Sequence, residues 1–126
     1  MQETGEAALD SGNPVLLRRI AINTGEKTIF EDVENIIYIE TQGRGSLVHT
    51  NEGEYPDSRT IGEYEKKLGG CGFFRIHKSY LISLGKVREA FLWGGSSLGL
   101  KMKGYEQNIL PVSREKSRQL RKLLEG

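Results

Sequence analysis

Residues 73–87 read FFRIHKSYLISLGKV, and this stretch indicates the fold more clearly than any other part of the chain. Its first half alternates apolar and polar side chains, which is typical of a β-strand with one buried face. His77, Lys78 and Ser79 follow, and apolar residues resume soon after them. The apolar flanks are expected to pack in the core and hold the backbone, so that His77 and Lys78 face outward at a turn.

Segments of similar character lie on both sides of this stretch. Further strands are expected within residues 15–32, as a hairpin that turns at Gly25, and in residues 33–41, 47–50, 86–93, 98–103 and 106–112. Glycine-rich turns separate several of them, including QGRGS at 42–46 and GGSS at 94–97. The pattern predicts a mostly β domain built from many short strands.

Two segments instead show the periodicity of helices. Residues 58–70 contain Thr60 and Glu63 at the spacing of an N-terminal capping box, followed by apolar residues on one helical face. Residues 113–126 begin with Ser113, a natural N-cap. The apolar stripe of this second helix consists of Leu120, Leu123 and Leu124. The expected architecture therefore includes a short central helix and a C-terminal helix.

The chain length of 126 residues suits one compact domain. Residues 1–14 are nearly free of large apolar groups and are expected to form a flexible N-terminal tether, with residues 15–126 as the folded domain. The sequence has no apolar run near the roughly 20 residues that a transmembrane helix needs, and it does not begin like a signal peptide. The single cysteine, Cys71, excludes an internal disulfide and fits a reducing compartment, so the expected location is the cytoplasm.

The formal net charge of +1 conceals an uneven distribution of charge. Residues 1–60 carry 5 basic and 11 acidic side chains, a balance of −6, and residues 61–126 carry 13 basic and 6 acidic side chains, a balance of +7. A basic half indicates a face that meets a polyanion. The alternative is a solvated surface whose charges serve only solubility.

The sequence contains no constellation that is typical of an enzyme. His49 and His77 are the only histidines, and neither has a cysteine or histidine at the spacing of metal ligands, so both are expected to be ordinary strand residues. Cys71 lies in a glycine-rich connector with no base beside it, which disfavours a catalytic thiol. The glycine-containing loops also lack the pattern of a phosphate loop. We therefore expect a binding protein with no enzymatic activity, metal or cofactor.

Three predicted turns combine basic side chains with small hydrogen-bonding groups. They contain Arg44; His77, Lys78 and Ser79; and Ser113 and Arg114, which Lys116 and Arg118 follow. An arginine flanked by glycines can extend without steric hindrance, and its guanidinium matches O6 and N7 of guanine. Lysine, serine and histidine at a strand end suit phosphate oxygens, as does a helix N-terminus. Each turn taken alone is more often a solvated loop, but together with the basic half they favour a nucleic acid partner.

The same segments resemble a known family. FFRIHKSYLISLGKV resembles the signature of LytTR-type DNA-binding domains, which occur in bacterial response regulators and stand-alone transcription factors. The residues that match this signature are Phe74, Arg75, His77, Ser79, Tyr80 and Leu81, with Val87 as a later apolar position. Residues 33–55 resemble the family's Asp-Ile-x-Tyr-Ile-Glu run and the hairpin after it, residues 59–68 its short helix, and residues 109–124 its closing strand and basic helix. The resemblance extends over residues 18–124.

This resemblance implies about ten short strands in antiparallel sheets, with loops rather than a recognition helix entering DNA. It also implies sequence-specific binding to direct repeats upstream of promoters, through bases in successive major grooves, for the regulation of transcription. The implied base contacts fall on Arg44, Lys78 and Arg114. The implied contacts to the DNA backbone fall on Gly45, His77, Ser79, Ser113, Lys116 and Arg118.

The chain departs from the family pattern at three points. Its first loop reads GRGS at 43–46, where family members commonly have a polar or aromatic side chain. Lys78 stands where arginine or asparagine is usual, so it keeps the charge but loses the planar geometry of an arginine, and Ser83 replaces the usual asparagine. The expected partners are double-stranded DNA, a second copy on the same DNA, and an upstream receiver domain or histidine kinase pathway. Residues 1–14 are too short to form a receiver domain, so the chain is expected to be a stand-alone regulator or an excised effector domain. The alternative is a protein-interaction module with a basic docking face and little DNA affinity of its own.

Overall fold

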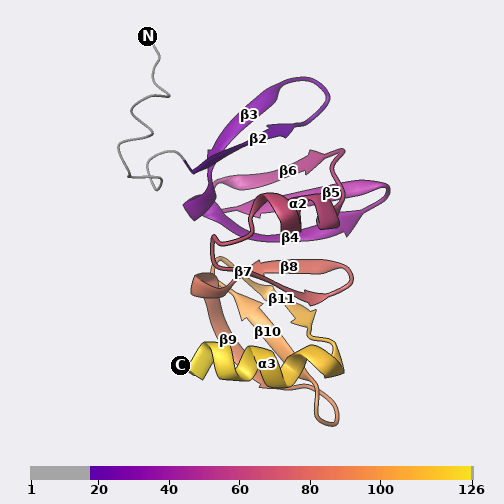
Figure 1. Cartoon of the computed structure of the whole chain (residues 1–126), viewed down its shortest axis with the longest axis vertical. Coiled ribbons are helices and arrows are strands. Elements are labelled where there is room, and N and C mark those ends of the chain that lie inside the picture. The colour runs from indigo at the N-terminus through magenta and orange to yellow at the C-terminus, as the bar shows by residue number, and fades with distance from the viewer. Residues whose placement is uncertain (1–17, 126) are drawn as a thin grey trace.

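The computed structural model describes residues 18–125, and the tether expected in residues 1–14 lies outside the described residues. The described chain forms ten strands and two α-helices, which confirms the predicted fold class (Figure 1). The strands are β2 (Arg19–Asn23), β3 (Thr28–Asp32), β4 (Ile36–Gln42), β5 (Gly45–Thr50), β6 (Gly53–Asp57), β7 (Phe73–His77), β8 (Tyr80–Ser83), β9 (Val87–Leu92), β10 (Leu98–Met102) and β11 (Tyr105–Pro111). The helices are α2 (Ile61–Lys67) and α3 (Arg114–Glu125).

A five-stranded antiparallel sheet in the order β6-β5-β4-β8-β7 forms the centre of the molecule. Strand β4 pairs on one side with β5, its neighbour in sequence, and on the other side with β8. The pairing of β4 with β8 sets Ile39 opposite Leu81 and Tyr38 opposite Ile82. Because side chains alternate along a strand, these two pairs point to opposite faces of the sheet.

Each face of this central sheet is covered by a hydrophobic core. On one face, Ile39, Val48 and Leu81 pack with the apolar side of α2 and with the β2–β3 hairpin. On the other face, Tyr38 and Ile82 pack against a second antiparallel sheet, in the order β11-β10-β9, and against α3. A fully buried aliphatic or aromatic side chain contributes about 1.5–3 kcal/mol to folding, so the two cores fix the sheet from both sides.

The two helices begin where the sequence predicts. At the start of α2, the Thr60 hydroxyl accepts a hydrogen bond from the Glu63 backbone N–H at 3.2 Å, and the Glu63 carboxylate accepts one from the Thr60 N–H at 2.8 Å. This confirms the capping box. In α3, Leu120 is fully buried and Leu124 packs at the edge of the same core, but Leu123 is 48% exposed. The predicted apolar stripe of α3 is therefore wrong at Leu123, because only the side of the helix that carries Leu120 and Leu124 faces the core.

Two local assignments also differ from the sequence pattern. Residues Val33–Asn35 form a 3-10 turn instead of the first part of a strand, and the Asn35 amide donates a hydrogen bond to the Glu31 carboxylate at 2.8 Å. The sequence pattern does not predict strand β6, which contains Pro56. Proline is tolerated there because β6 is an edge strand that pairs only with β5.

A buried polar cluster fixes the end of β6 against α2. The Tyr64 hydroxyl donates a hydrogen bond to the carboxylate of Asp57, which also accepts from the Ser58 backbone N–H at 2.8 Å. Burial raises the pKa of Tyr64 above its ordinary value, and the hydrogen bond and negative charge of Asp57 raise it further. The phenol therefore stays protonated and keeps donating to Asp57 throughout the physiological pH range.

Gly45 begins β5 at a point where the neighbouring strand approaches closely. A Cβ atom added to Gly45 would lie 2.2 Å from the backbone oxygen of Asp57, which cannot move without disturbing β6. By contrast, a Cβ atom on Gly62 in α2 would have only the Thr60 hydroxyl oxygen, at 3.9 Å, as a neighbour. The two glycines therefore differ in how much a methyl group would disturb the fold.

We expect Gly45→Ala to lower the free energy of unfolding by about 1–3 kcal/mol, which is typical of overpacking, and to loosen β6. Gly62→Ala is the matched control and should stabilise the protein by about 0.4–1 kcal/mol, because alanine is the better helix former. Urea denaturation of both variants measures these changes. Equal stabilities for Gly45→Ala and the parent protein would contradict the close approach of the two strands.

Candidate nucleic-acid interface

The three predicted turns lie along one edge of the molecule. In Figure 1, the β4–β5 turn, the β7–β8 turn and the beginning of α3 follow one another down the right-hand side. Two backbone hydrogen bonds join them. The Thr41 N–H donates to the Ser79 carbonyl at 3.0 Å, and the Ser113 N–H donates to the Ile76 carbonyl at 2.8 Å. The interface is therefore assembled from segments that are far apart in the sequence.

The first turn presents Arg44 at its tip. Gln42 and Gly45 pair across the hairpin, which leaves Gly43 and Arg44 as a two-residue turn. Gly43 has a φ of +60°, whereas Arg44 does not have a positive φ, as in a type II′ turn. The Arg44 side chain is exposed. Gly45 has a packing role beside β6, which explains the glycine without any contact to a ligand.

Arg75 holds the second turn in shape from the strand that precedes it. Its guanidinium donates to the carbonyl of His77 at 3.1 Å and to the carbonyl of Lys78 at 2.7 Å. A third bond reaches the Glu65 carboxylate in α2 at 2.8 Å. In the sequence, Arg75 stands out only as part of the signature. Its position two residues before the turn is the one feature that could have indicated its role in holding the turn.

The side chains of the second turn are arranged as outward donors. The Nδ1 atom of His77 accepts a hydrogen bond from the Ser79 backbone N–H at 3.0 Å. A neutral imidazole that accepts at Nδ1 carries its proton on Nε2, so that N–H remains available to a ligand. Lys78 is exposed, while His77 and Ser79 are half-buried. The turn therefore offers an ammonium group and an imidazole N–H on a backbone that is already fixed.

The third segment is the first turn of α3. The carbonyl of Ser113 accepts from the N–H groups of Lys116 and Ser117 at 3.0 and 3.1 Å, and Arg114 is exposed beside it. The Lys116 ammonium lies 5.3 Å from the centre of the Phe74 ring, which places it next to β7. A shallow hollow lined by residues of both segments joins the second turn to the third. Its lining residues are Arg75, His77, Lys78, Ser113, Glu115 and Lys116. Arg118 is exposed one helical turn further on.

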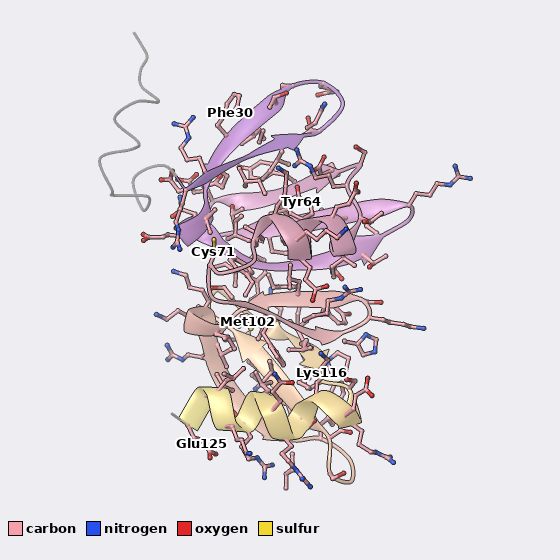
Figure 2. All side chains as sticks on the ribbon, in the orientation of Figure 1. Phe30, Tyr64, Cys71, Met102, Lys116 and Glu125 are labelled. Carbon is pink, nitrogen blue, oxygen red and sulfur yellow. The ribbon has the colours of Figure 1, made fainter. Side chains whose placement is uncertain are left out.

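The other residues considered for chemistry lie away from this edge. His49 is buried on β5, where its Nε2 atom lies 2.7 Å from the Glu40 carboxylate and its ring stacks on Tyr38. Cys71 is half-buried and packs against the core beneath α2, on the side of the molecule opposite the three turns (Figure 2). Within residues 18–125, no group of histidine, cysteine, aspartate or glutamate side chains is placed to hold a metal ion. The helices of the described chain are too short and too polar to span a bilayer.

Comparisons with known proteins assign the chain to a family. The family model described as the LytTr DNA-binding domain matches residues 26–125. The chain is 33% identical to the sensory transduction protein LytT of Bacillus subtilis over 106 residues, which are 84% of this chain and 43% of that protein. It is 35% identical to the CO-responsive transcriptional regulator RcoM of Rhodospirillum rubrum over 111 residues, which are 88% of this chain and 47% of that protein.

A third relative, the transcriptional regulatory protein YpdB of Escherichia coli, is 31% identical over 99 residues, 79% of this chain and 40% of that protein. The chain thus spans less than half the length of these relatives. Among solved structures, the LytTr DNA-binding domain of a Bacillus cereus response regulator matches with a TM-score of 0.75. That match covers 86% of this chain and 98% of the other at 21% identity, so it supports the fold. The chain therefore belongs to the family of LytTr DNA-binding domains, which bind DNA in the regulation of transcription.

Proposed function

We propose that this domain binds a direct repeat in double-stranded DNA sequence-specifically, and that residues of its three turns read bases in successive major grooves. The observation that carries the proposal is the alignment of these turns along one edge (Figure 1). The base-contacting side chains are Arg44, Lys78 and Arg114, because each is exposed at the tip of its turn or at the start of its helix. An arginine fork can read guanine in the major groove, whereas the ammonium of Lys78 acts as a point charge.

The contacts to the DNA backbone come from the groups that surround these tips. Phosphate oxygens accept from the Nε2 proton of His77, the hydroxyls of Ser79 and Ser113, and the charged groups of Lys116 and Arg118. The N-terminus of α3 adds unpaired backbone N–H groups and the positive end of the helix dipole. The backbone of Gly45, which directly follows Arg44, is assigned to the adjoining phosphate.

Arg75 is a positioning residue in this interface. Carbonyl oxygens at the surface of the second turn would repel phosphate, and the guanidinium of Arg75 occupies two of them. It also ties the turn to α2 through Glu65. Because the backbone is held before DNA arrives, less conformational freedom is lost on binding.

The longer relatives indicate the setting in which the domain works. Their names describe sensory transduction and transcriptional regulation, so we infer a cytoplasmic regulator without enzymatic activity, coupled to a receiver domain or histidine kinase pathway. A direct repeat would bring two copies of the domain to one operator. The rival function, docking of an acidic protein on the basic face, predicts retention on any polyanion but no preferred sequence.

Selection of bound duplexes from a random DNA pool tests the proposal. We expect enrichment of a short motif that occurs twice in the same orientation, with contacted positions about one helical turn apart within each copy. A protein-docking module would bind DNA without enriching any motif. A pool that remains random after repeated selection at moderate salt would therefore contradict sequence-specific binding.

On the enriched operator, we expect Arg114→Ala to weaken binding by about 1–3 kcal/mol, because a bidentate contact to a base is lost. The variant should also tolerate substitutions at one operator position that the parent protein rejects. Affinity titrations on a panel of single-base operator variants measure both effects. Arg19→Ala, an exposed arginine on β2, is the matched control and should leave affinity and preference unchanged. An unaltered base preference in Arg114→Ala would exclude Arg114 from base recognition.

For Lys116→Gln, we expect a uniform loss of affinity on all sequences and a salt dependence reduced by about one phosphate equivalent. Glutamine keeps most of the aliphatic stem beside Phe74 while removing the charge. Lys103→Gln serves as the control, since the Lys103 N–H donates to the Lys86 carbonyl beside the Leu84–Lys86 turn, on the other side of the molecule. Measuring the dissociation constant at four or more salt concentrations gives the slopes, and identical slopes for the two variants would argue against a phosphate contact.

A further inference from the structure

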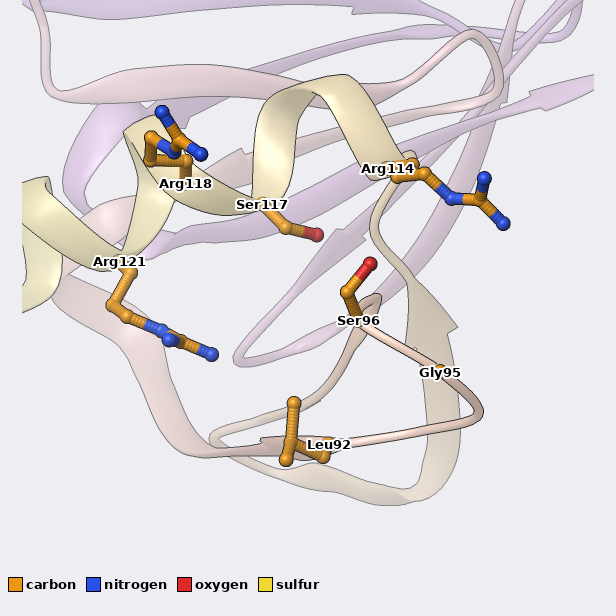
Figure 3. Close-up of a pocket in the computed structure, with 7 residues that line it drawn as sticks. All are labelled: Leu92, Gly95, Ser96, Arg114, Ser117, Arg118 and Arg121. Carbon is orange, nitrogen blue, oxygen red and sulfur yellow. The ribbon is translucent and has the colours of Figure 1, made fainter.

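A second hollow lies beside Arg114, between α3 and the tip of the β9–β10 hairpin. Figure 3 shows Arg114 and Arg121 at its two ends, with Ser96 of the hairpin tip between them. The other residues that line it are Leu92, Gly95, Ser117 and Arg118. Except for Arg114 and Arg118, these residues are not among the proposed DNA contacts.

The three arginines form one charged row on α3. Residues 114, 118 and 121 are spaced by four and three positions, which places them on the same side of a helix. All three side chains are exposed. None of the residues that line the hollow is acidic, and no ion pair within residues 18–125 involves any of the three guanidinium groups. The row is therefore a concentration of positive charge whose guanidinium groups form no ion pair within the described chain.

The hairpin tip that faces this row is fixed in position. The Trp93 N–H donates to the Ser97 carbonyl at 2.9 Å, which closes the turn. The buried hydroxyl of Ser117 accepts from the Leu98 N–H at 3.3 Å, so the hairpin is held directly against α3. Ser96 is exposed at the tip. A serine and three arginines thus line one open hollow.

We propose that this hollow binds backbone phosphates that border the major groove entered by Arg114. The proposal rests on the DNA-binding function argued above and extends its contact surface to Arg121 and Ser96. The major groove is about 8.5 Å deep. Residues on a helix rise by 1.5 Å each, so Arg118 and Arg121 lie about 6 and about 10.5 Å behind Arg114 along α3. With Arg114 at the base edges, the other two guanidinium groups are at the height of the phosphates on the groove rim.

The position of the hollow, together with its chemistry, favours a DNA phosphate as the ligand. Guanidinium groups bind phosphate through two parallel hydrogen bonds, and a serine hydroxyl supplies a further donor. The hollow is continuous with the proposed interface through Arg114, so a phosphate bound there belongs to the same duplex. The β9–β10 hairpin tip and α3 then hold the DNA backbone from two sides.

The test compares Arg121→Ala with Lys122→Ala, which removes the same charge from the next residue of α3 but does not line the hollow. Both are measured on the enriched operator with single phosphates replaced by neutral methylphosphonates. For Arg121→Ala, we expect a several-fold loss of affinity and a salt dependence reduced by about one phosphate equivalent. At one rim phosphate, neutralisation should weaken the parent protein but have no further effect on Arg121→Ala. Ser96→Ala should show a smaller loss at the same phosphate.

Lys122→Ala should retain the full sensitivity to neutralisation of that phosphate. The inference is overturned if Arg121→Ala has the affinity and salt dependence of the parent protein. It is equally overturned if every methylphosphonate weakens binding of Arg121→Ala as much as it weakens binding of the parent protein. It is also overturned if Lys122→Ala and Arg121→Ala behave alike. These results are distinct from failure of the proposed function, since that would appear as the absence of an enriched operator and of any change of base preference in Arg114→Ala.

Discussion

The pairing of β8 with β4 holds the proposed DNA interface together. It joins two hairpins that are separated by about forty positions in the chain, and it ends in the hydrogen bond from Thr41 to Ser79 that sets their turns side by side. The register of this pairing is fixed because Leu81 faces one core and Ile82 faces the other. A shift by one residue would exchange the two side chains between the cores, so the register is strongly specified. The placement of Arg44 relative to Lys78 follows from that register.

The second constraint fastens the third segment to the same edge. The bond from the Ser113 N–H to the Ile76 carbonyl ties the start of α3 to β7, one residue before the turn that carries Lys78. Leu120 anchors the body of the helix in the core, and Ser117 connects it to β10. The backbone of the interface is thus rigid, while Arg44, Lys78 and Arg114 remain exposed on long side chains. Such a surface can adapt its side chains to DNA without reordering its backbone.

The division of the sequence into an acidic and a basic half corresponds only in part to the edge formed by the three segments. Two of the three segments, together with the arginine row of α3, come from the basic half of the chain. Arg44 comes from the acidic half, and it reaches the same edge because β4 pairs with β8. Some carboxylates of the acidic half form contacts within the folded domain instead of facing solvent. Glu40 lies against His49, and Asp57 is buried beside Tyr64.

Features that depend on neighbouring residues could be read directly from the amino-acid order. The capping box at Thr60 and the glycine turns arise from local geometry, and so the helix and hairpins are where their patterns predict. Strand β6 and the exposed position of Leu123 could not be predicted, because each depends on which element lies alongside. The same holds for the carbonyl contacts of Arg75, which need the turn to fold back over that side chain. Candidate residues at the three turns are visible in the sequence, but their alignment on one edge requires a strand pairing across some forty residues, and no local pattern encodes such a pairing.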